Sequence, residues 1–97
     1  MRETVVTQTA KEDLEKIASF LQDSYSQKIK TDFLTAFSER LLLIEQMPFM
    51  FQASATNPDV RYCLVHKHVA FYYRVTDEFI FILSVIDNRM NPDNRPF

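Results

Sequence analysis

The spacing of apolar residues predicts two consecutive helices in the first half of the chain. Apolar side chains recur every three or four positions, as one face of a helix requires, at Ala10, Leu14, Ile17, Ala18, Leu21 and Tyr25. This pattern predicts a helix over about residues 10–24, and Thr9 with Glu12 fits a capping box at its start. A second stripe from Ile29 to Met47 stops at Pro48 and predicts a second helix. Because two or three residues join the helices, we expect an antiparallel hairpin.

The pattern changes after the loop at residues 48–58. A β-prone run precedes the first helix at residues 4–8, and β-branched and aromatic residues predict three later strands, over residues 60–65, 68–75 and 79–86. The turns between these three are tight, so we expect antiparallel pairing, with the doubly apolar last strand in the sheet interior. The order β-α-α-β-β-β predicts an α+β fold, a helical hairpin packed on an antiparallel sheet, as one domain over residues 1–97.

Composition excludes several kinds of site. The chain contains no glycine, so it lacks the glycine-rich loops that hold phosphates, and we expect no cofactor. Cys63 is the single cysteine, which excludes an internal disulfide and a cysteine-based zinc site. The net charge of −2 gives no general attraction to nucleic acid. The start has no secretory signal, and the longest apolar run, residues 79–86, is too short to cross a membrane, so we expect a cytoplasmic protein.

Several motifs follow one another in an order typical of a known family. They are A-x-x-D-L-x-x-I at residues 10–17, an aliphatic Ile44 four positions before Pro48, Arg61 at a strand start, Y-x-V at residues 73–75, and an apolar strand running into Arg89. With these motifs the chain resembles the RelE/ParE superfamily, the toxins of type II toxin–antitoxin systems that serve in plasmid stabilisation. The resemblance covers nearly the whole chain and is stronger to the ParE branch than to the RelE branch.

The resemblance implies a toxin that inhibits growth and is neutralised by an antitoxin whose helix and tail wrap around it. ParE-like members bind DNA gyrase, whereas RelE-like members cut messenger RNA on the ribosome. Many members carry histidine shortly before the closing arginine, where this chain has Asp87. A carboxylate there repels RNA phosphate, and the chain is acidic, so binding of gyrase is favoured. A RelE-type mRNA endoribonuclease and a non-toxic remnant or interaction domain stay open as alternatives, and with them the question of enzyme activity.

Arginines on the predicted strands are the candidates for binding the target. Arg61, Arg74 and Arg89 come from three strands or their ends, and a sheet could bring them to one face. The planar guanidinium suits phosphate or carboxylate, although strand arginines also commonly pair with Asp or Glu. The candidates for catalysis are Arg61, Arg89 and the two histidines His66 and His68. No third metal ligand lies near the histidines in sequence, so we expect no metal site.

An apolar run in the loop is the candidate for antitoxin binding. Phe49, Met50 and Phe51 follow Pro48 directly, and with Leu42 on the preceding helix there are more apolar residues than one sheet face needs to cover. An exposed run of this kind often marks a partner groove, and an amphipathic antitoxin helix would cover it. We therefore expect a complex with the antitoxin, in which a small oligomer can form.

Overall fold

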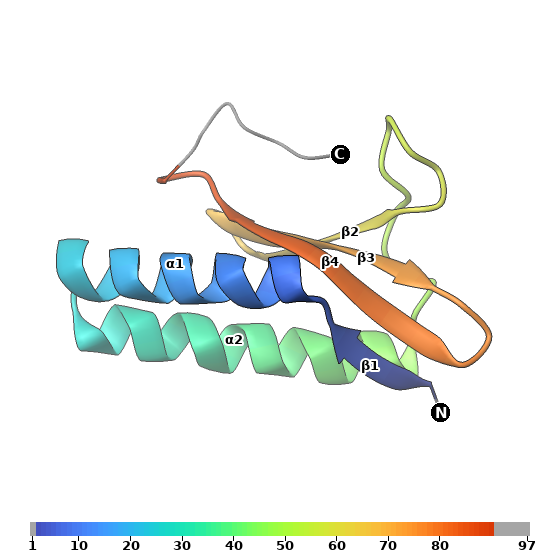
Figure 1. The fold of residues 1–97 in the computed structure, drawn as a ribbon, viewed down its shortest axis with the longest axis horizontal. Coiled ribbons are helices and arrows are strands. Elements are labelled where there is room, and N and C mark those ends of the chain that lie inside the picture. The colour runs from blue at the N-terminus through green and yellow to red at the C-terminus, as the bar shows by residue number, and fades with distance from the viewer. Residues whose placement is uncertain (1, 91–97) are drawn as a thin grey trace.

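Two helices pack on one face of a four-stranded sheet (Figure 1). The computed structural model describes residues 2–90. Its elements are β1 (Glu3–Val6), α1 (Gln8–Ser24), α2 (Gln27–Gln46), β2 (Arg61–His66), β3 (Val69–Val75) and β4 (Phe79–Asp87). The predicted element order and the α+β fold class are therefore confirmed. None of the described helices is long and apolar enough to cross a membrane.

The sheet has the strand order β1-β4-β3-β2 and is mixed. The strands β2, β3 and β4 pair antiparallel, as their tight turns predict. The short β1 instead pairs parallel with β4, from Glu3 opposite Phe79 to Val6 opposite Ile82, so the expectation of a wholly antiparallel sheet is wrong for this strand. A four-residue strand carries no signal for its direction against a partner more than 70 residues away. The interior place predicted for β4 is confirmed.

The helix starts differ from the predicted ones. Thr7, not Thr9, caps α1: its Oγ1 accepts a hydrogen bond from the Ala10 amide at 3.3 Å and donates one to the Ile82 carbonyl at 2.7 Å. The capping box at Thr9 is therefore wrong, because Thr7 also gains a bond to β4 that a local pattern does not contain. Helix α2 begins two residues earlier than predicted, after Ser26, whose hydroxyl accepts from the Ile29 amide at 3.1 Å.

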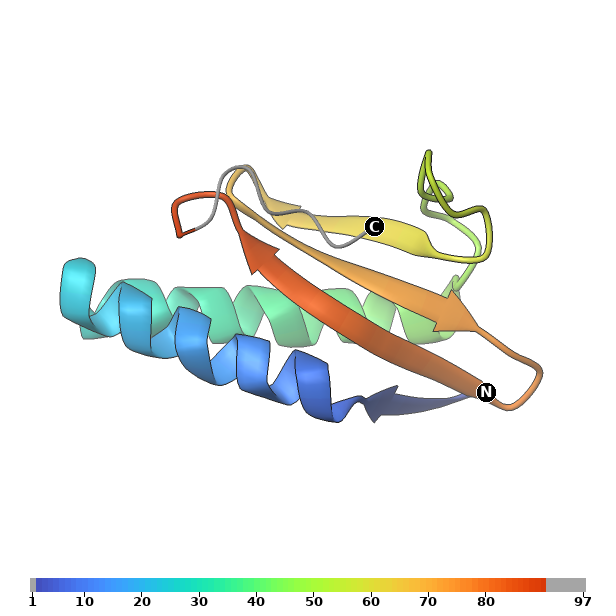
Figure 2. The ribbon, with the colours of Figure 1, turned by 45° about the horizontal axis from the view of Figure 1, so that its top comes forward.

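The core lies between the helices and the sheet. Figure 2 shows both helices on one side, and the loop between α2 and β2 at the end of the sheet where β1 begins and β3 ends. The rings of Phe37 on α2 and Phe71 on β3 pack edge to face, with their centres 5.4 Å apart. The core cluster also contains Ala10, Ile17, Leu21, Phe33, Ile44, Cys63, Val65, Val69, Tyr73, Ile80, Ile82 and Val85.

Beyond the end of β1, helix α1 supplies the hydrogen-bonding partner for the edge of β4. The carboxylate of Asp13 accepts hydrogen bonds from the Ser84 hydroxyl and the Val85 amide, both at 3.0 Å. Because β1 ends its pairing at Ile82, the Val85 amide has no strand partner on that side. Asp13 therefore satisfies a backbone donor that would otherwise be unpaired at the sheet edge.

Replacing Asp13 is expected to destabilise the fold through this edge. Asp13→Ala should lower the free energy of unfolding by about 2 kcal/mol, because two hydrogen bonds to a charged acceptor are lost. Asp13→Asn should lose less, since its amide oxygen still accepts. Urea denaturation measures the difference, with Glu15→Ala on the exposed side of α1 as the control. Equal stability of Asp13→Ala and Glu15→Ala would contradict this role.

Candidate functional site

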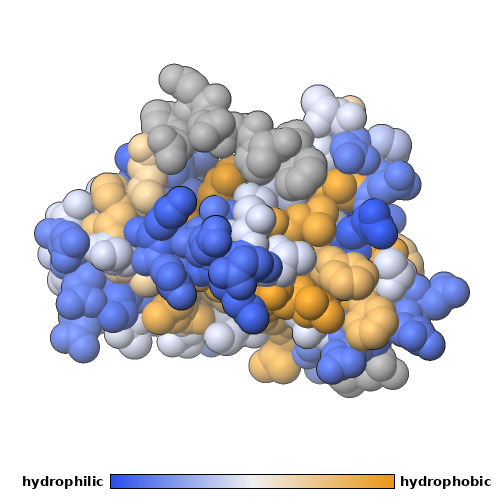
Figure 3. All heavy atoms as spheres, in the orientation of Figure 1, coloured by the Kyte–Doolittle hydropathy of each residue, from blue (hydrophilic) through white to orange (hydrophobic). Residues whose placement is uncertain are grey.

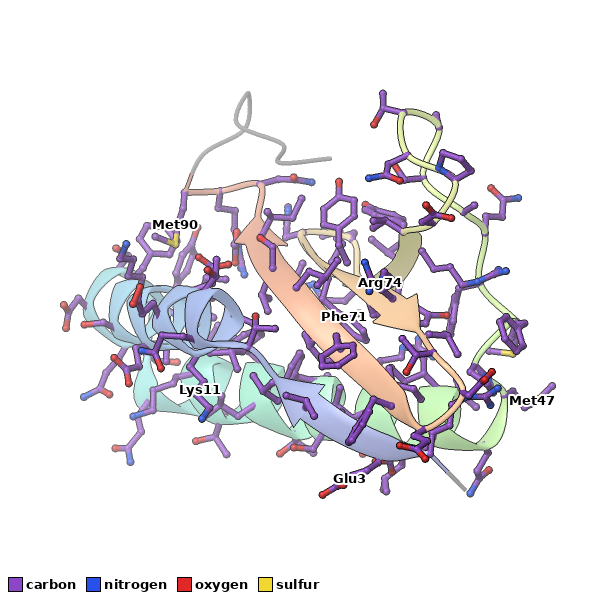
Figure 4. The ribbon with its side chains drawn as sticks, turned by 45° about the vertical axis from the view of Figure 1, so that its right-hand side comes forward. Glu3, Lys11, Met47, Phe71, Arg74 and Met90 are labelled. Carbon is purple, nitrogen blue, oxygen red and sulfur yellow. The ribbon has the colours of Figure 1, made fainter. Side chains whose placement is uncertain are left out.

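The end of α2 and the loop after it present an exposed apolar surface. We call Leu42, Met47, Phe49 and Met50 the apolar patch; these residues are 61%, 52%, 58% and 45% exposed. Phe51, also expected to contact an antitoxin, is half-buried and packs against the core cluster. Figure 4 shows Met47 at the opposite end of the molecule from Met90. Apolar side chains also gather over β1 and β4 (Figure 3).

Two side chains from the sheet hold the loop that carries this patch. The buried hydroxyl of Tyr73 donates to the Pro48 carbonyl at 2.7 Å, and Arg61 Nη1 donates to the Phe51 carbonyl at 2.6 Å. The segment then runs beside β2, where the Tyr62 amide donates to the Gln52 carbonyl at 3.0 Å. Burial raises the pKa of Tyr73 to about 12, so this hydroxyl keeps its proton and stays a donor at neutral pH. The position of the patch therefore depends on the sheet below it.

Removing the Tyr73 hydroxyl is expected to weaken this anchor. Tyr73→Phe leaves the Pro48 carbonyl without its partner and should lower the free energy of unfolding by about 1–2 kcal/mol. Urea denaturation followed by circular dichroism measures the loss. The matched control is Tyr62→Phe, whose hydroxyl makes no hydrogen bond to the described residues. The same loss in both variants would contradict an anchoring role for Tyr73.

Arg61 lies within the patch region rather than on a separate surface. Its guanidinium carbon is 5.0 Å from the centre of the Phe49 ring, a cation–π distance. Arg2, just before β1, reaches the same ring at 5.3 Å. No sequence pattern indicated Arg2. Met47 was expected on the apolar stripe of the second helix, and its exposure was not indicated, because it depends on where the loop lies in space. Arg61 was a candidate for the target and Phe49 for the antitoxin, and the structure places them in contact.

Arg74 and Arg89 lie elsewhere. Arg74 is exposed on the outer face of the sheet, since its neighbours on β3, Tyr73 and Val75, face the helices (Figure 4). On β3, Arg74 pairs with Phe81 whereas Val69 pairs with Asp87, so the two ends are about 17 Å apart along the strand. Arg89 lies beyond that far end. The sheet could have brought the three arginines to one face, but it does not: Arg74 lies on the outer face of β3, and Arg89 lies beyond the opposite end of the strand.

Arg89 is tied to the one buried carboxylate of the described core. The side chain of Asp87 is fully buried. Its Oδ2 accepts a hydrogen bond from Arg89 Nη2 at 2.7 Å, and its Oδ1 accepts one from Arg89 Nε at 3.0 Å. The guanidinium also lies 5.2 Å from the centre of the Tyr25 ring. Hydrogen bonding to Asp87 raises the pKa of Arg89. The pair holds the end of β4 next to the helical hairpin, and the two charges neutralise each other.

The two histidines lie at this same end of the sheet. The His68 amide donates to His66 Nδ1 at 3.2 Å, and their ring centres are 6.3 Å apart. Arg61 is at the start of β2 and these histidines at its end, so the four candidates for catalysis do not converge. Within residues 2–90, no three His, Cys, Asp or Glu side chains are grouped so as to hold a metal ion.

His66 is expected to make stability depend on pH. Burial lowers the pKa of His66, and the nearby Arg89 lowers it further, against the opposing effect of Asp87. The unfolded chain therefore binds this proton more tightly than the folded one, so stability is full above about pH 6.5 and falls as the pH drops below it. Urea denaturation between pH 7 and 5 measures the slope. In His66→Asn, whose Oδ1 can still accept from the His68 amide, the slope should shrink; an unchanged slope would contradict this origin.

A shallow hollow of about 270 Å³ lies beside β2 and was not indicated by the sequence. It is lined by two tyrosines from neighbouring strands, Tyr62 and Tyr72, with ring centres 5.2 Å apart. The segment 52–56 completes the lining. The tyrosines are cross-strand partners, and this register could have been expected from the predicted strands.

Comparisons with known proteins agree with the fold. The family model described as ParE toxin of type II toxin-antitoxin system, parDE, matches residues 5–92. A structure of the chromosomal ParDE toxin–antitoxin system from P. aeruginosa superposes with a TM-score of 0.77 at 18% identity, covering 90% of this chain and 96% of that one. No curated protein sequence matches the chain.

Two further structures share the fold at lower similarity. A copper-bound mutant toxin from Helicobacter pylori has a TM-score of 0.62 at 14% identity, covering 94% of this chain and 99% of that one. The chain matched in the DinJ–YafQ complex from E. coli has a TM-score of 0.59 at 12% identity, covering 94% of this chain and 98% of that one. At these identities the likeness concerns the fold.

Proposed function

Because the chain belongs to the family of ParE toxins of type II toxin–antitoxin systems, we propose that it arrests growth in the cytoplasm by binding its target, DNA gyrase, and that a cognate antitoxin neutralises it. The observation that favours action by binding, rather than by RNA cleavage, is the Asp87–Arg89 pair. Cleavage of RNA through its 2′-hydroxyl needs a base, an acid and cations around one phosphate. Here the carboxylate is buried and the cation beside it is neutralised, which favours binding over cleavage.

We propose Arg61 and Arg74 as the principal contacts with the target. Neither forms an ion pair with any residue in the described part of the chain, so their charges are available to an acidic surface. Arg89, the third candidate, already donates three hydrogen bonds to Asp87 through its amide, Nε and Nη2. A contact by Arg89 would have to use its remaining donors. We therefore expect Arg89→Ala to act mainly on stability.

We propose that the antitoxin covers the apolar patch. Four exposed apolar side chains on one loop and the helix before it are typical of a partner site, and an amphipathic helix is a partner that would cover them. The solved ParDE system and DinJ–YafQ complex are toxin–antitoxin systems of the same fold, which supports this assignment. Because Arg61 touches the Phe49 ring, an antitoxin on the patch also covers Arg61. Neutralisation would then follow from masking a target contact.

Induced expression in a bacterial host tests the proposal. The chain alone should arrest growth, and co-expression of the protein encoded by the adjacent reading frame should restore it. Arg74→Ala should weaken arrest while its melting temperature stays near that of the original chain, because Arg74 is exposed. Arg61→Ala should lose arrest with a modest fall in melting temperature, because its bond to the Phe51 carbonyl is lost, whereas Arg89→Ala should lose more stability. No arrest by the folded chain would point to a non-toxic remnant. Arrest that persists in Arg61→Ala and Arg74→Ala would move the target surface to the helical hairpin.

A further inference from the structure

Two arginines from distant parts of the sequence converge on one exposed ring. The guanidinium carbons of Arg2 and Arg61 lie 5.3 Å and 5.0 Å from the centre of the Phe49 ring, so they are at most about 10 Å apart. Each is held by a backbone carbonyl: Arg2 Nε donates to Thr76 at 2.7 Å and Arg61 Nη1 to Phe51 at 2.6 Å. A hydrogen bond to the backbone therefore holds each guanidinium in place.

These two positive charges have no negative partner in the described structure. The ion pairs formed by residues 2–90 join Lys28 to Asp32 and Arg89 to Asp87, and neither includes Arg2 or Arg61. A guanidinium has five N–H donors, and the backbone carbonyls occupy few of them here. Two like charges within about 10 Å of each other repel, and a carboxylate beside them would reduce that repulsion and accept from the remaining donors.

We propose that Arg2, Phe49 and Arg61 form a clamp for a carboxylate side chain of the antitoxin, within an acidic segment that has apolar residues on either side. The apolar neighbours follow from the position of the clamp, because Met47 and Met50 of the apolar patch belong to the same loop as Phe49 and are about half exposed. A nucleic acid fits less well, because the chain carries a net charge of −2 and this surface is mostly apolar. The inference rests on the proposed neutralisation by an antitoxin.

Peptide binding to the complete chain tests the clamp. The chain is made by cell-free synthesis, and the probes are overlapping 15-residue peptides that cover the product of the adjacent reading frame. The peptides that bind should contain Asp or Glu beside apolar residues. Arg2→Gln and Arg61→Gln should each weaken binding about tenfold to a hundredfold, as loss of a charged hydrogen-bonding partner does. The control Lys11→Gln removes an exposed charge on α1 and should leave binding unchanged.

A double-mutant cycle separates a direct contact from an altered loop. Exchanging the peptide carboxylate for its amide should cost as much as Arg61→Gln, and the two changes together should cost little more than one. Arg2→Gln leaves the bond from Arg61 to the loop in place, so it tests the clamp even where Arg61→Gln lowers the melting temperature.

Three results would overturn the clamp. They are tight binding by peptides without a carboxylate, affinity unchanged in both Arg2→Gln and Arg61→Gln, and displacement of the peptides by a single-stranded RNA 15-mer at equal concentration. If the peptides bind without the clamp, the proposal of an antitoxin on the apolar patch survives. If even the full-length product of the adjacent reading frame fails to bind, the antitoxin proposal itself is wrong, and the clamp with it.

Discussion

Asp87→Ala is expected to lower the free energy of unfolding by about 3 kcal/mol, because it leaves the charge of Arg89 unpaired beside the core. The side chain of Arg89 is 18% exposed, so it can regain some water, which places the loss at the lower end of what breaking a buried pair costs. The variant also loses the bond from the Arg89 amide to Asp87 Oδ1 at 2.8 Å. Urea denaturation measures the change.

Two comparisons show whether the ion pair is responsible. Asp32→Ala breaks the exposed pair with Lys28 and should cost less than about 1 kcal/mol. The double variant Asp87→Ala with Arg89→Ala should lose less than the sum of the single variants, since no charge is left unpaired. If Asp87→Ala costs no more than Asp32→Ala, the pair does not hold the end of β4, and it no longer counts against RNA cleavage.

Phe49→Ala is expected to lower the affinity for the antitoxin at least about 30-fold. Large aromatic side chains at the centre of an interface typically contribute 2 kcal/mol or more, which corresponds to this factor. Leu42→Ala should act in the same direction, with a smaller effect because less area is lost. Since Phe49 is 58% exposed, its loss should leave the melting temperature nearly unchanged. Surface plasmon resonance with the product of the adjacent reading frame measures the affinity.

The control for this prediction is another exposed apolar residue outside the patch. Leu64 on β2 is 46% exposed, and its strand neighbours Cys63 and Val65 face the helices, so Leu64 lies on the outer face of the sheet. Leu64→Ala should keep full affinity. Equal losses in Phe49→Ala and Leu64→Ala would place the antitoxin on the outer face or on both surfaces, against the assignment to the apolar patch.

The helices and the antiparallel strands could be predicted because their signals are local. An amphipathic stripe such as that of α1 follows from apolar residues at helical spacing, and β4 reads as an interior strand because it is apolar on both faces. The cap at Thr7 and the parallel pairing of β1 could not be predicted from the sequence, because both depend on contacts with β4, more than 70 residues later in the chain.

The candidate site was predictable in part for the same reason. Exposure of Phe49 and Met50 follows from three apolar residues in a loop, and the structure confirms it for these two. The contact of Arg61 with Phe49 depends on a loop path that the bond from Tyr73 to Pro48 fixes. The pair of Asp87 with Arg89 did have a local signal, since opposite charges two residues apart can meet at a strand end.

The most direct measurement adds the purified chain to DNA gyrase and, in parallel, to ribosomes translating a defined messenger RNA. The account predicts that supercoiling by gyrase is inhibited, that Arg61→Ala relieves the inhibition, and that the messenger stays intact. Discrete messenger fragments together with normal supercoiling would contradict it, and would show that this chain cleaves RNA despite its buried Asp87.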